Sequence, residues 1–183
     1  MNGQRAEAEN ALNQVVAFSQ DSGAWAAGKP AQVFLGAVLI AKGQMGLGLK
    51  LLKEGKQEML TSGDVLYYLQ CEYILAKVFS QIAEGAEPIN LLRIVKNIRF
   101  FAKNVPFASK KAEWHFKKVI EVAEEMGAKI FVGNACLDLG LLYKAKKKKD
   151  QANKFRTTAV THFEQCEADE YQTQANEALD SLQ

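Results

Sequence analysis

The stretch from Gly23 to Pro30 is the part of this sequence closest to a motif that does chemistry. It reads GAWAAGKP and nearly matches the phosphate-binding loop GxxxxGK[ST]. In that loop, backbone N–H groups surround the phosphates, the lysine reaches the outer phosphates and a hydroxyl binds magnesium. Here Pro30 replaces the hydroxyl residue, and a helical pattern stands where the motif requires a strand. We therefore interpret the stretch as an ordinary loop, with a phosphate site as the alternative.

The histidines and cysteines form no recognisable metal or nucleophile motif. His115 and His162 fall on different predicted helices, and Cys166 follows His162 by one helical turn. A zinc site needs three or four ligands, and no second pair lies nearby in sequence. The odd, widely spaced set of Cys71, Cys136 and Cys166 argues against a disulfide framework and for a reducing compartment. The sequence thus predicts no catalytic residues, no metal and no cofactor.

Charged residues cluster without pairing into an acid–base site. Neighbouring acids such as Glu124 and Glu125 point to different sides of a helix, so we read them as solvated. Five lysines lie together near the end of a predicted helix, where positive charge complements the exposed carbonyl groups. The alternative is a contact for an acidic partner or for nucleic acid, although no stacking aromatics are interleaved. The lysines are Lys144, Lys146, Lys147, Lys148 and Lys149.

The elements that position these residues are predicted to be helices. Apolar residues recur at spacings of three and four, and runs with a period of two are absent. Each helix has one apolar face, which it must bury against a neighbour, and short loops make neighbours antiparallel. The predicted helices cover about 5–19, 30–42, 45–61, 64–85, 88–105, 108–126, 130–146, 150–166 and 169–182.

Two of the predicted helix pairs share one pattern of small and apolar residues. Glycine in mid-helix costs about 1 kcal/mol, so Gly36 and Gly140 need a reason. We expect two helices to approach each other closely at both positions. The aligned positions are Leu35 with Leu139, Gly36 with Gly140, Leu39 with Tyr143, Gly48 with Ala152, Leu51 with Phe155 and Gly55 with Ala159.

The aligned positions resemble the tetratricopeptide repeat (TPR), which places a Leu-Gly pair and an aromatic in its first helix and small residues in its second. Cys136 stands where the repeat has tryptophan, Lys147 replaces the turn glycine and the closing proline is missing, so the chain is TPR-like. The resemblance implies an all-α, antiparallel helix-pair solenoid with a right-handed superhelix and about nine helices. It would be one domain over 1–183, with 1–20 as a leading helix and 169–183 as a capping helix.

Three longer stretches resemble the C-terminal region of large bacterial signalling proteins. They read NIRFFAKNVPFASKKAEWHFKKVIEVAEEMGAK, LDLGLLYKAKKKKDQA and HFEQCEADEYQTQANEAL. Those proteins carry a class III adenylate/guanylate cyclase domain, then an ATPase module, then TPR-type helices, and the resemblance covers roughly 63–182. It implies a regulatory or interaction segment of a larger protein. The cyclase and ATPase motifs do not occur in this chain, so neither activity is implied for it.

A partner would bind the surface lined by the first helix of each pair, which is the concave surface of a helical solenoid. Simple burial is the alternative for the apolar members of that surface. We expect a non-catalytic scaffold that binds a protein, a peptide or another domain of its parent chain. The alternative is a homo-oligomerisation element, with Trp114 and the tyrosines in the interface. The candidate binding residues are Tyr73, Lys77, Asn134, Leu137, Leu141 and Lys144.

The overall composition fits a folded domain and excludes several classes of protein. Hydrophobic residues make up 48% of the chain, and 23 basic against 21 acidic residues leave a net charge of +2, which argues against nucleic-acid binding. The longest apolar run, 33–41, is far shorter than the about 20 residues that a membrane span needs. The polar N-terminus lacks the apolar core of a signal peptide. The sequence therefore predicts a cytoplasmic chain without a membrane segment.

Overall fold

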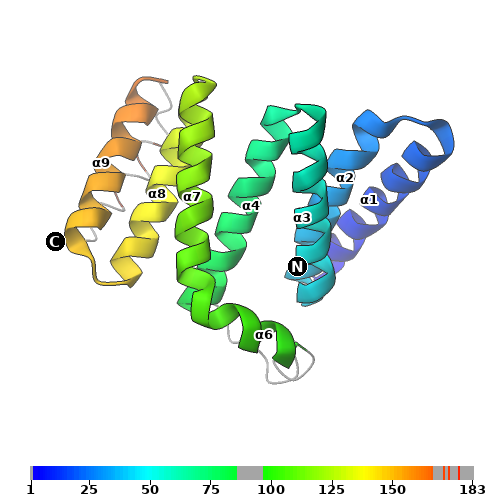
Figure 1. The fold of residues 1–183 in the computed structure, drawn as a ribbon, viewed down its shortest axis with the longest axis horizontal. Helices are drawn as coiled ribbons and strands as arrows, with labels where there is room; N and C mark the ends of the chain where they lie inside the picture. Colours follow the sequence, from blue (N-terminus) through cyan, green and yellow to red (C-terminus); the bar gives the residue numbers. More distant parts are fainter. Residues whose placement is uncertain (1, 86–96, 167–170, 172, 174–176, 178–183) are drawn as a thin grey trace. The chain divides into compact units, whose positions relative to one another are not determined.

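The computed structural model describes residues 2–85, 97–166, 171, 173 and 177, and these residues form an all-helical structure (Figure 1). No strand occurs in these ranges, so the all-α prediction is confirmed for them. The helices are α1 (Asn2–Ser22), α2 (Trp25–Ala41), α3 (Met45–Ser62), α4 (Val65–Glu84), α6 (Ile98–Asn104), α7 (Ala108–Glu125), α8 (Lys129–Ala145) and α9 (Lys149–Glu164), with a 3-10 turn, η1, at Val105–Phe107.

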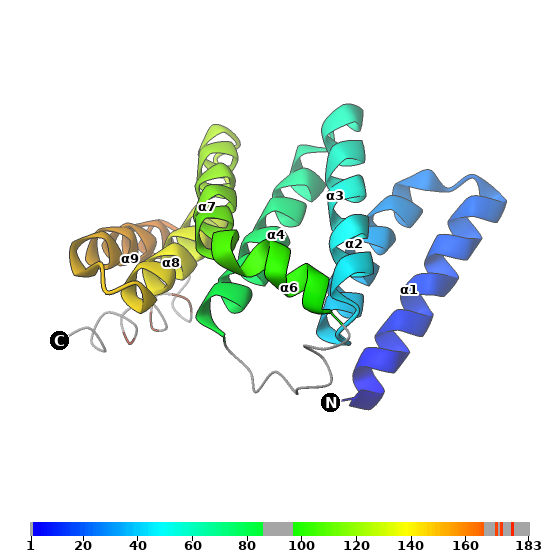
Figure 2. The same ribbon diagram turned by 60° about the horizontal axis from the view of Figure 1, so that its bottom comes forward.

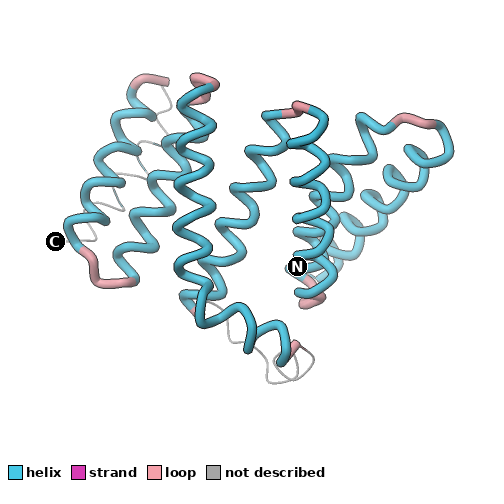
Figure 3. The backbone as a smooth tube through the Cα atoms, viewed as in Figure 1, coloured by secondary structure: helices cyan, strands magenta, loops and turns pink. Residues whose placement is uncertain are grey.

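The chain divides into two compact units. Unit 1 comprises Met1–Leu75 and Glu87–Asn104, and unit 2 comprises Ala76–Ala86 and Val105–Gln183. Within unit 1, α2 packs on both α1 and α3; within unit 2, α8 packs on both α7 and α9. Figures 2 and 3 show these consecutive helices side by side, joined by short turns. Helices that follow one another in sequence therefore supply the main helix contacts within each unit.

Both units bury the apolar stripes that the sequence pattern predicts. In unit 1, Leu39 of α2 and Leu52 and Met59 of α3 are buried; in unit 2, Phe116 of α7 and Leu139 of α8 are buried. Burying a side chain of this size contributes about 1.5–3 kcal/mol. Since a single amphipathic helix is unstable in water, this burial is what holds each helix in place.

Gly36 and Gly140 lie where two helices cross backbone to backbone. A Cβ atom on Gly36 would lie 2.8 Å from the carbonyl oxygen of Gly48, and one on Gly140 would lie 3.2 Å from the carbonyl oxygen of Ala152. Gly48 and Ala152 are the positions that the sequence alignment pairs. Neither crossing leaves room for a side chain without movement of the partner helix, which is the close approach expected from the sequence.

The two crossings also correspond in their next contact. A Cβ on Gly36 would lie 3.1 Å from Leu52 Cγ, and one on Gly140 would lie 2.7 Å from Arg156 Cγ. Leu52 and Arg156 occupy equivalent positions, and both are 0% exposed. The α2–α3 and α8–α9 pairs therefore share one crossing geometry, although the residue packed over the glycine differs.

Four turns between helices close in the same way. After α2, α3, α7 and α8 the chain enters the left-handed region at Gly43, Gly63, Gly127 and Lys147 respectively. The next N–H then donates to a carbonyl five residues back, as from Ala128 to Ala123, which is the Schellman arrangement. Three of these turns use glycine, which adopts this conformation without steric penalty. Lys147, at φ 58°, is the exception.

Several predicted helix ends need correction. The predicted loop 20–29 is wrong, because α2 begins at Trp25 and Pro30 lies inside it. The helix predicted over 150–166 begins one residue earlier, as α9, so that Asp150 lies in its first turn and Lys148 occupies the cap position. The predicted helix 88–105 is described only over Ile98–Asn104, and the predicted helix 169–182 falls largely outside the described residues. The predicted number of nine helices therefore stays a prediction.

The α8–α9 crossing can be tested by filling it. We expect Gly140→Leu to lower the free energy of unfolding by about 3 kcal/mol or more, since the new side chain must displace Ala152 and Arg156. A matched control is Gly46→Leu in α3, because a Cβ there would meet nothing within 4 Å. The control should change stability by less than about 1 kcal/mol. Equal urea midpoints for the two variants would contradict the crossing.

Candidate functional site

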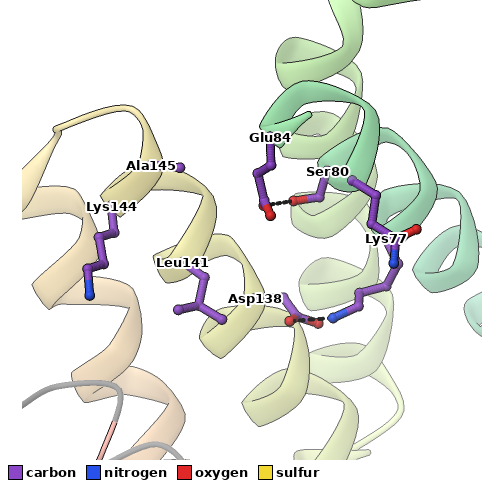
Figure 4. A pocket seen from close by; sticks show the side chains of 8 residues that line it. Lys77, Ser80, Glu84, Asp138, Leu141, Lys144 and Ala145 are labelled. Carbon is purple, nitrogen blue, oxygen red and sulfur yellow. Dashed lines mark hydrogen bonds and ion pairs between the residues drawn. The ribbon is translucent and has the colours of Figure 1, made fainter. Parts of the chain in front are cut away.

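Unit 2 contains a groove between the end of α4 and the second half of α8 (Figure 4). Its volume is about 690 Å³, which lies in the range of about 300–1,000 Å³ typical of ligand pockets. One wall is the end of α4 and the other is α8. Because both segments belong to unit 2, the packing of this unit forms the groove. The lining residues are Lys77, Ser80, Gln81, Glu84, Asp138, Leu141, Lys144 and Ala145.

Helical spacing explains why these side chains share the groove. On α4, Lys77, Ser80 and Glu84 recur at intervals of three and four, and Asp138 and Leu141 are three apart on α8. Residues at these intervals lie on one helix face. Each helix therefore presents a stripe that combines charged groups with the apolar Leu141, which is 39% exposed.

Two polar contacts fix the walls of the groove. The Lys77 Nζ atom lies 2.7 Å from Asp138 Oδ1, so an ion pair joins α4 to α8. The Ser80 hydroxyl donates to Glu84 Oε1 at 2.7 Å within α4 (Figure 4). The Lys77 side chain is 46% exposed and the Asp138 side chain is 13% exposed, so the carboxylate of Asp138 is the more enclosed group of the pair. These contacts orient the side chains but leave Leu141 accessible.

Three of the six candidate binding residues line the groove, and the other three do not. Lys77, Leu141 and Lys144 line it, as expected for residues on a common binding surface. Tyr73, Asn134 and Leu137 do not line it, and all three are half-buried; Tyr73 belongs to unit 1.

Sequence reasoning missed the other lining residues, although helical spacing could have found all five. Ser80, Gln81 and Glu84 lie three, four and seven residues after Lys77. Asp138 lies three residues before Leu141 and Ala145 lies four after it, so each of the five shares a helix face with a predicted residue.

A second polar site in unit 2 centres on Glu113 of α7. Its carboxylate accepts hydrogen bonds at 2.8 Å from both Lys117 Nζ and Tyr143 Oη, and Lys146 Nζ lies 3.4 Å from Oε2. Partial burial alone would raise the pKa of Glu113. The hydrogen bonds from Lys117 and Tyr143 and the charges of Lys117 and Lys146 outweigh it and lower the pKa to about 2. Glu113 therefore stays ionised and links α7 to the end of α8.

Next to this site, three exposed lysines form what we call the lysine turn, residues 147–149 between α8 and α9. Lys148 Nζ lies 5.7 Å from the centre of the Tyr143 ring, and Lys146 Nζ lies 5.9 Å from it on the way into the turn. The Tyr143 ring itself is 1% exposed and stacks on Phe155. The turn therefore presents positive charge around a covered aromatic ring.

The side chains of Cys71, Cys136 and His115 are packed in the helical core. Burial raises the pKa of the Cys71 and Cys136 thiols to about 12, which keeps them protonated. His115 is buried and stacks on Phe79. Within the described ranges, no three His, Cys, Asp or Glu side chains come together as a metal site would require.

The stretch resembling a phosphate-binding loop is mostly helical. It forms the start of α2 from Trp25 onward, and a Cβ on Gly28 would lie 1.7 Å from Ser19 Oγ of α1. The backbone around Gly28 is thus covered by α1, whereas a phosphate-binding loop leaves its N–H groups open. The interpretation as a loop is corrected to a helix N-terminus packed on α1.

No protein-family model matches this chain, and no curated protein shows significant similarity to it. In the described part of the chain, no helix is long and apolar enough to cross a membrane.

The Glu113 site predicts a specific acid dependence. Because its folded-state pKa of about 2 is below the ordinary 4.5, Glu113 stabilises the fold fully above pH 4.5 and loses this contribution as the pH falls through about 2. Glu113→Gln should therefore cost about 1–2 kcal/mol at neutral pH. The difference from the unmodified protein should shrink between pH 4.5 and about 2.

Urea unfolding across this pH range measures the effect. Glu125→Gln removes an exposed carboxylate from the same helix and should change stability by no more than about 0.5 kcal/mol. A gap between Glu113→Gln and the unmodified protein that is independent of pH would refute the assignment.

Proposed function

We propose that the chain is a non-catalytic, TPR-like interaction module that binds an extended peptide or protein segment in the α4–α8 groove. The observation that carries this proposal is the groove itself: two helices of unit 2 hold Leu141 accessible between the Lys77–Asp138 ion pair and Lys144. Recognition sites combine apolar surface with a few polar groups that fix the orientation of the ligand; here Leu141 supplies the apolar contact and the Lys77–Asp138 pair the fixed polar one.

The TPR-like part of the proposal is supported by the repeated helix crossing. Gly36 with Gly48 and Gly140 with Ala152 form equivalent contacts in helix pairs far apart in sequence. Small residues at the crossing of paired helices are the feature that relates this chain to the repeat. On this basis we propose a solenoid of antiparallel helix pairs whose first helices carry the binding surface.

The partner class follows from the resemblance of residues 63–182 to the C-terminal region of bacterial cyclase–ATPase–TPR signalling proteins. In such a parent protein the module would act by binding another protein or another domain of the same chain. The mechanism is complementarity on a preformed surface with no bond chemistry. Binding would then be sensitive to the groove side chains and insensitive to the cysteines and histidines.

A peptide library displayed on phage tests the groove. We expect selected peptides to bind the unmodified chain and to lose about tenfold or more in affinity for Leu141→Glu, because a charge then occupies the apolar centre of the site. The matched control is Leu60→Glu, which changes a 56% exposed leucine of α3 in unit 1. Peptides that bind both variants equally, or a failure to select any peptide, would remove the proposal.

A homo-oligomerisation element is the second candidate, and the exposure of Trp114 favours it. This side chain is 55% exposed and packs edge-on against His115, at 4.8 Å between ring centres. Tryptophan is enriched at the centre of protein interfaces. Light scattering after size exclusion should then show a mass that rises with concentration and returns to the monomer in Trp114→Ala. A monomer at all concentrations excludes this candidate.

A further inference from the structure

We propose that the lysine turn, residues 147–149, is a docking surface for an acidic protein segment that continues from the α4–α8 groove. This inference rests on the proposed function, because the groove would hold the same segment. It goes further by assigning a charge to the partner and a role to residues outside the groove.

The backbone conformation of Lys147 is one in which a lysine is less stable than a glycine would be. Among the described residues, Lys147 is the one non-glycine residue with a positive φ. The equivalent turns after α2, α3 and α7 use Gly43, Gly63 and Gly127. An L-residue in this conformation carries a steric penalty that glycine avoids. A backbone outlier that persists against such a penalty points to function.

The start of α9 places two more lysines at unfavourable positions. Lys148 occupies the N-cap position and Lys149 is the first residue of the helix. Side chains that accept hydrogen bonds are favoured at the cap, and negative charge is favoured in the first turn. Two lysines here oppose both preferences, with Asp150 as the first-turn acid. Stabilising the end of α8 explains Lys144 and Lys146, but it does not explain Lys148 and Lys149.

The lysine turn brings three consecutive exposed positive charges together. No acidic side chain in the described part of the chain forms an ion pair with Lys147, Lys148 or Lys149. Single lysines such as Lys103 and Lys110 also have no ion pair within the described residues. The turn is therefore distinguished by the adjacency of its three charges, which an acidic segment would complement.

The groove leads directly to this charge. Lys144 and Ala145 line the groove, and the N–H of Lys147 donates to the carbonyl of Lys144 at 2.8 Å. Since the turn begins two residues after Ala145, a segment with an apolar side chain against Leu141 would place its residues on one side of that contact at the lysine turn. Carboxylates on those residues would complement the turn.

Nucleic acid fits this surface less well than an acidic protein segment. The aromatic ring among the lysines, Tyr143, is 1% exposed and cannot stack on a base. The sequence isoelectric point of 8.3 is lower than that of most nucleic-acid-binding domains, which exceed about 9. Stable binding to an anionic membrane needs apolar side chains that insert beside the lysines. Residues 147–149 include no apolar side chain, so a membrane is the less suitable ligand.

Fluorescence anisotropy with a labelled peptide of alternating Glu and Leu tests the proposal, with the Gln-for-Glu version as the uncharged probe. We expect the unmodified chain to bind the Glu peptide more tightly than the Gln peptide, and this preference to weaken with salt. In the Lys147→Gln, Lys148→Gln, Lys149→Gln triple variant, affinity for the Glu peptide should fall about tenfold. Affinity for the Gln peptide should stay unchanged.

Two controls separate charge from folding. The triple variant Lys50→Gln, Lys103→Gln, Lys110→Gln makes the same change in net charge at exposed lysines elsewhere and should reduce binding by less than about twofold. Lys147→Gly should weaken binding of the Glu peptide by about two- to threefold. It should also raise the melting temperature by about 2–4 °C, so its weaker binding could not come from unfolding.

The outcomes distinguish this inference from the proposed function. If both peptides bind equally and the lysine-turn variant changes nothing, while Leu141→Glu abolishes binding, the groove stands and the acidic partner is wrong. If neither peptide binds, the inference fails. Phosphatidylserine vesicles or a single-stranded oligonucleotide that bind more tightly than the Glu peptide, with the same dependence on the lysine turn, would overturn it in favour of that ligand.

Discussion

Direct contact between helix backbones at Gly36 and Gly140 is the constraint on which the rest of this structure depends. A side chain at either position would overlap the carbonyl oxygen of Gly48 or Ala152. In unit 2 this contact holds one face of α8 against α9. The opposite face, with Asp138 and Leu141, is thereby directed toward α4, where it forms the wall of the groove. The contact of α8 with α9 at Gly140 thus determines which face of α8 remains accessible.

The same crossing tolerates different chemistry above it. Leu52 fills the space over Gly36, and the aliphatic stem of Arg156 fills the space over Gly140. Arg156 is fully buried, and this burial lowers its pKa. A long charged side chain can replace leucine here because its methylene groups do the packing. The two crossings are therefore alike in their backbone contact more than in the type of side chain packed over the glycine.

Much of the fold could be predicted from local pattern. The close approach at Gly36 and Gly140 follows from glycine in mid-helix, and the ends of α3 and α7 follow from Gly63 and Gly127 in left-handed caps. The position of Pro30 could not be predicted in this way. Proline is favoured at the first turn of a helix, whereas here it lies one turn further in.

The candidate site was predicted only in part because its contacts join distant residues. Lys77 and Asp138 are 61 residues apart, and no periodicity relates them. The Glu113 site likewise joins α7 to Tyr143 and Lys146 across 30 and 33 residues. Helical spacing indicates which residues share a face, but which two faces meet depends on the packing of the helices. The pattern therefore identified Lys77, Leu141 and Lys144 without the carboxylates around them.

Helix α4 belongs to both units, since residues up to Leu75 group with unit 1 and residues from Ala76 group with unit 2. Helix formation is cooperative, because each residue added to an existing helix gains a hydrogen bond without a new nucleation step. Melting of α4 on one side of this boundary would leave unmatched backbone groups on the other. Unfolding of α4 in one unit would therefore also destabilise the part of α4 in the other unit. We expect the local opening reactions of the two units to be thermodynamically linked through this helix.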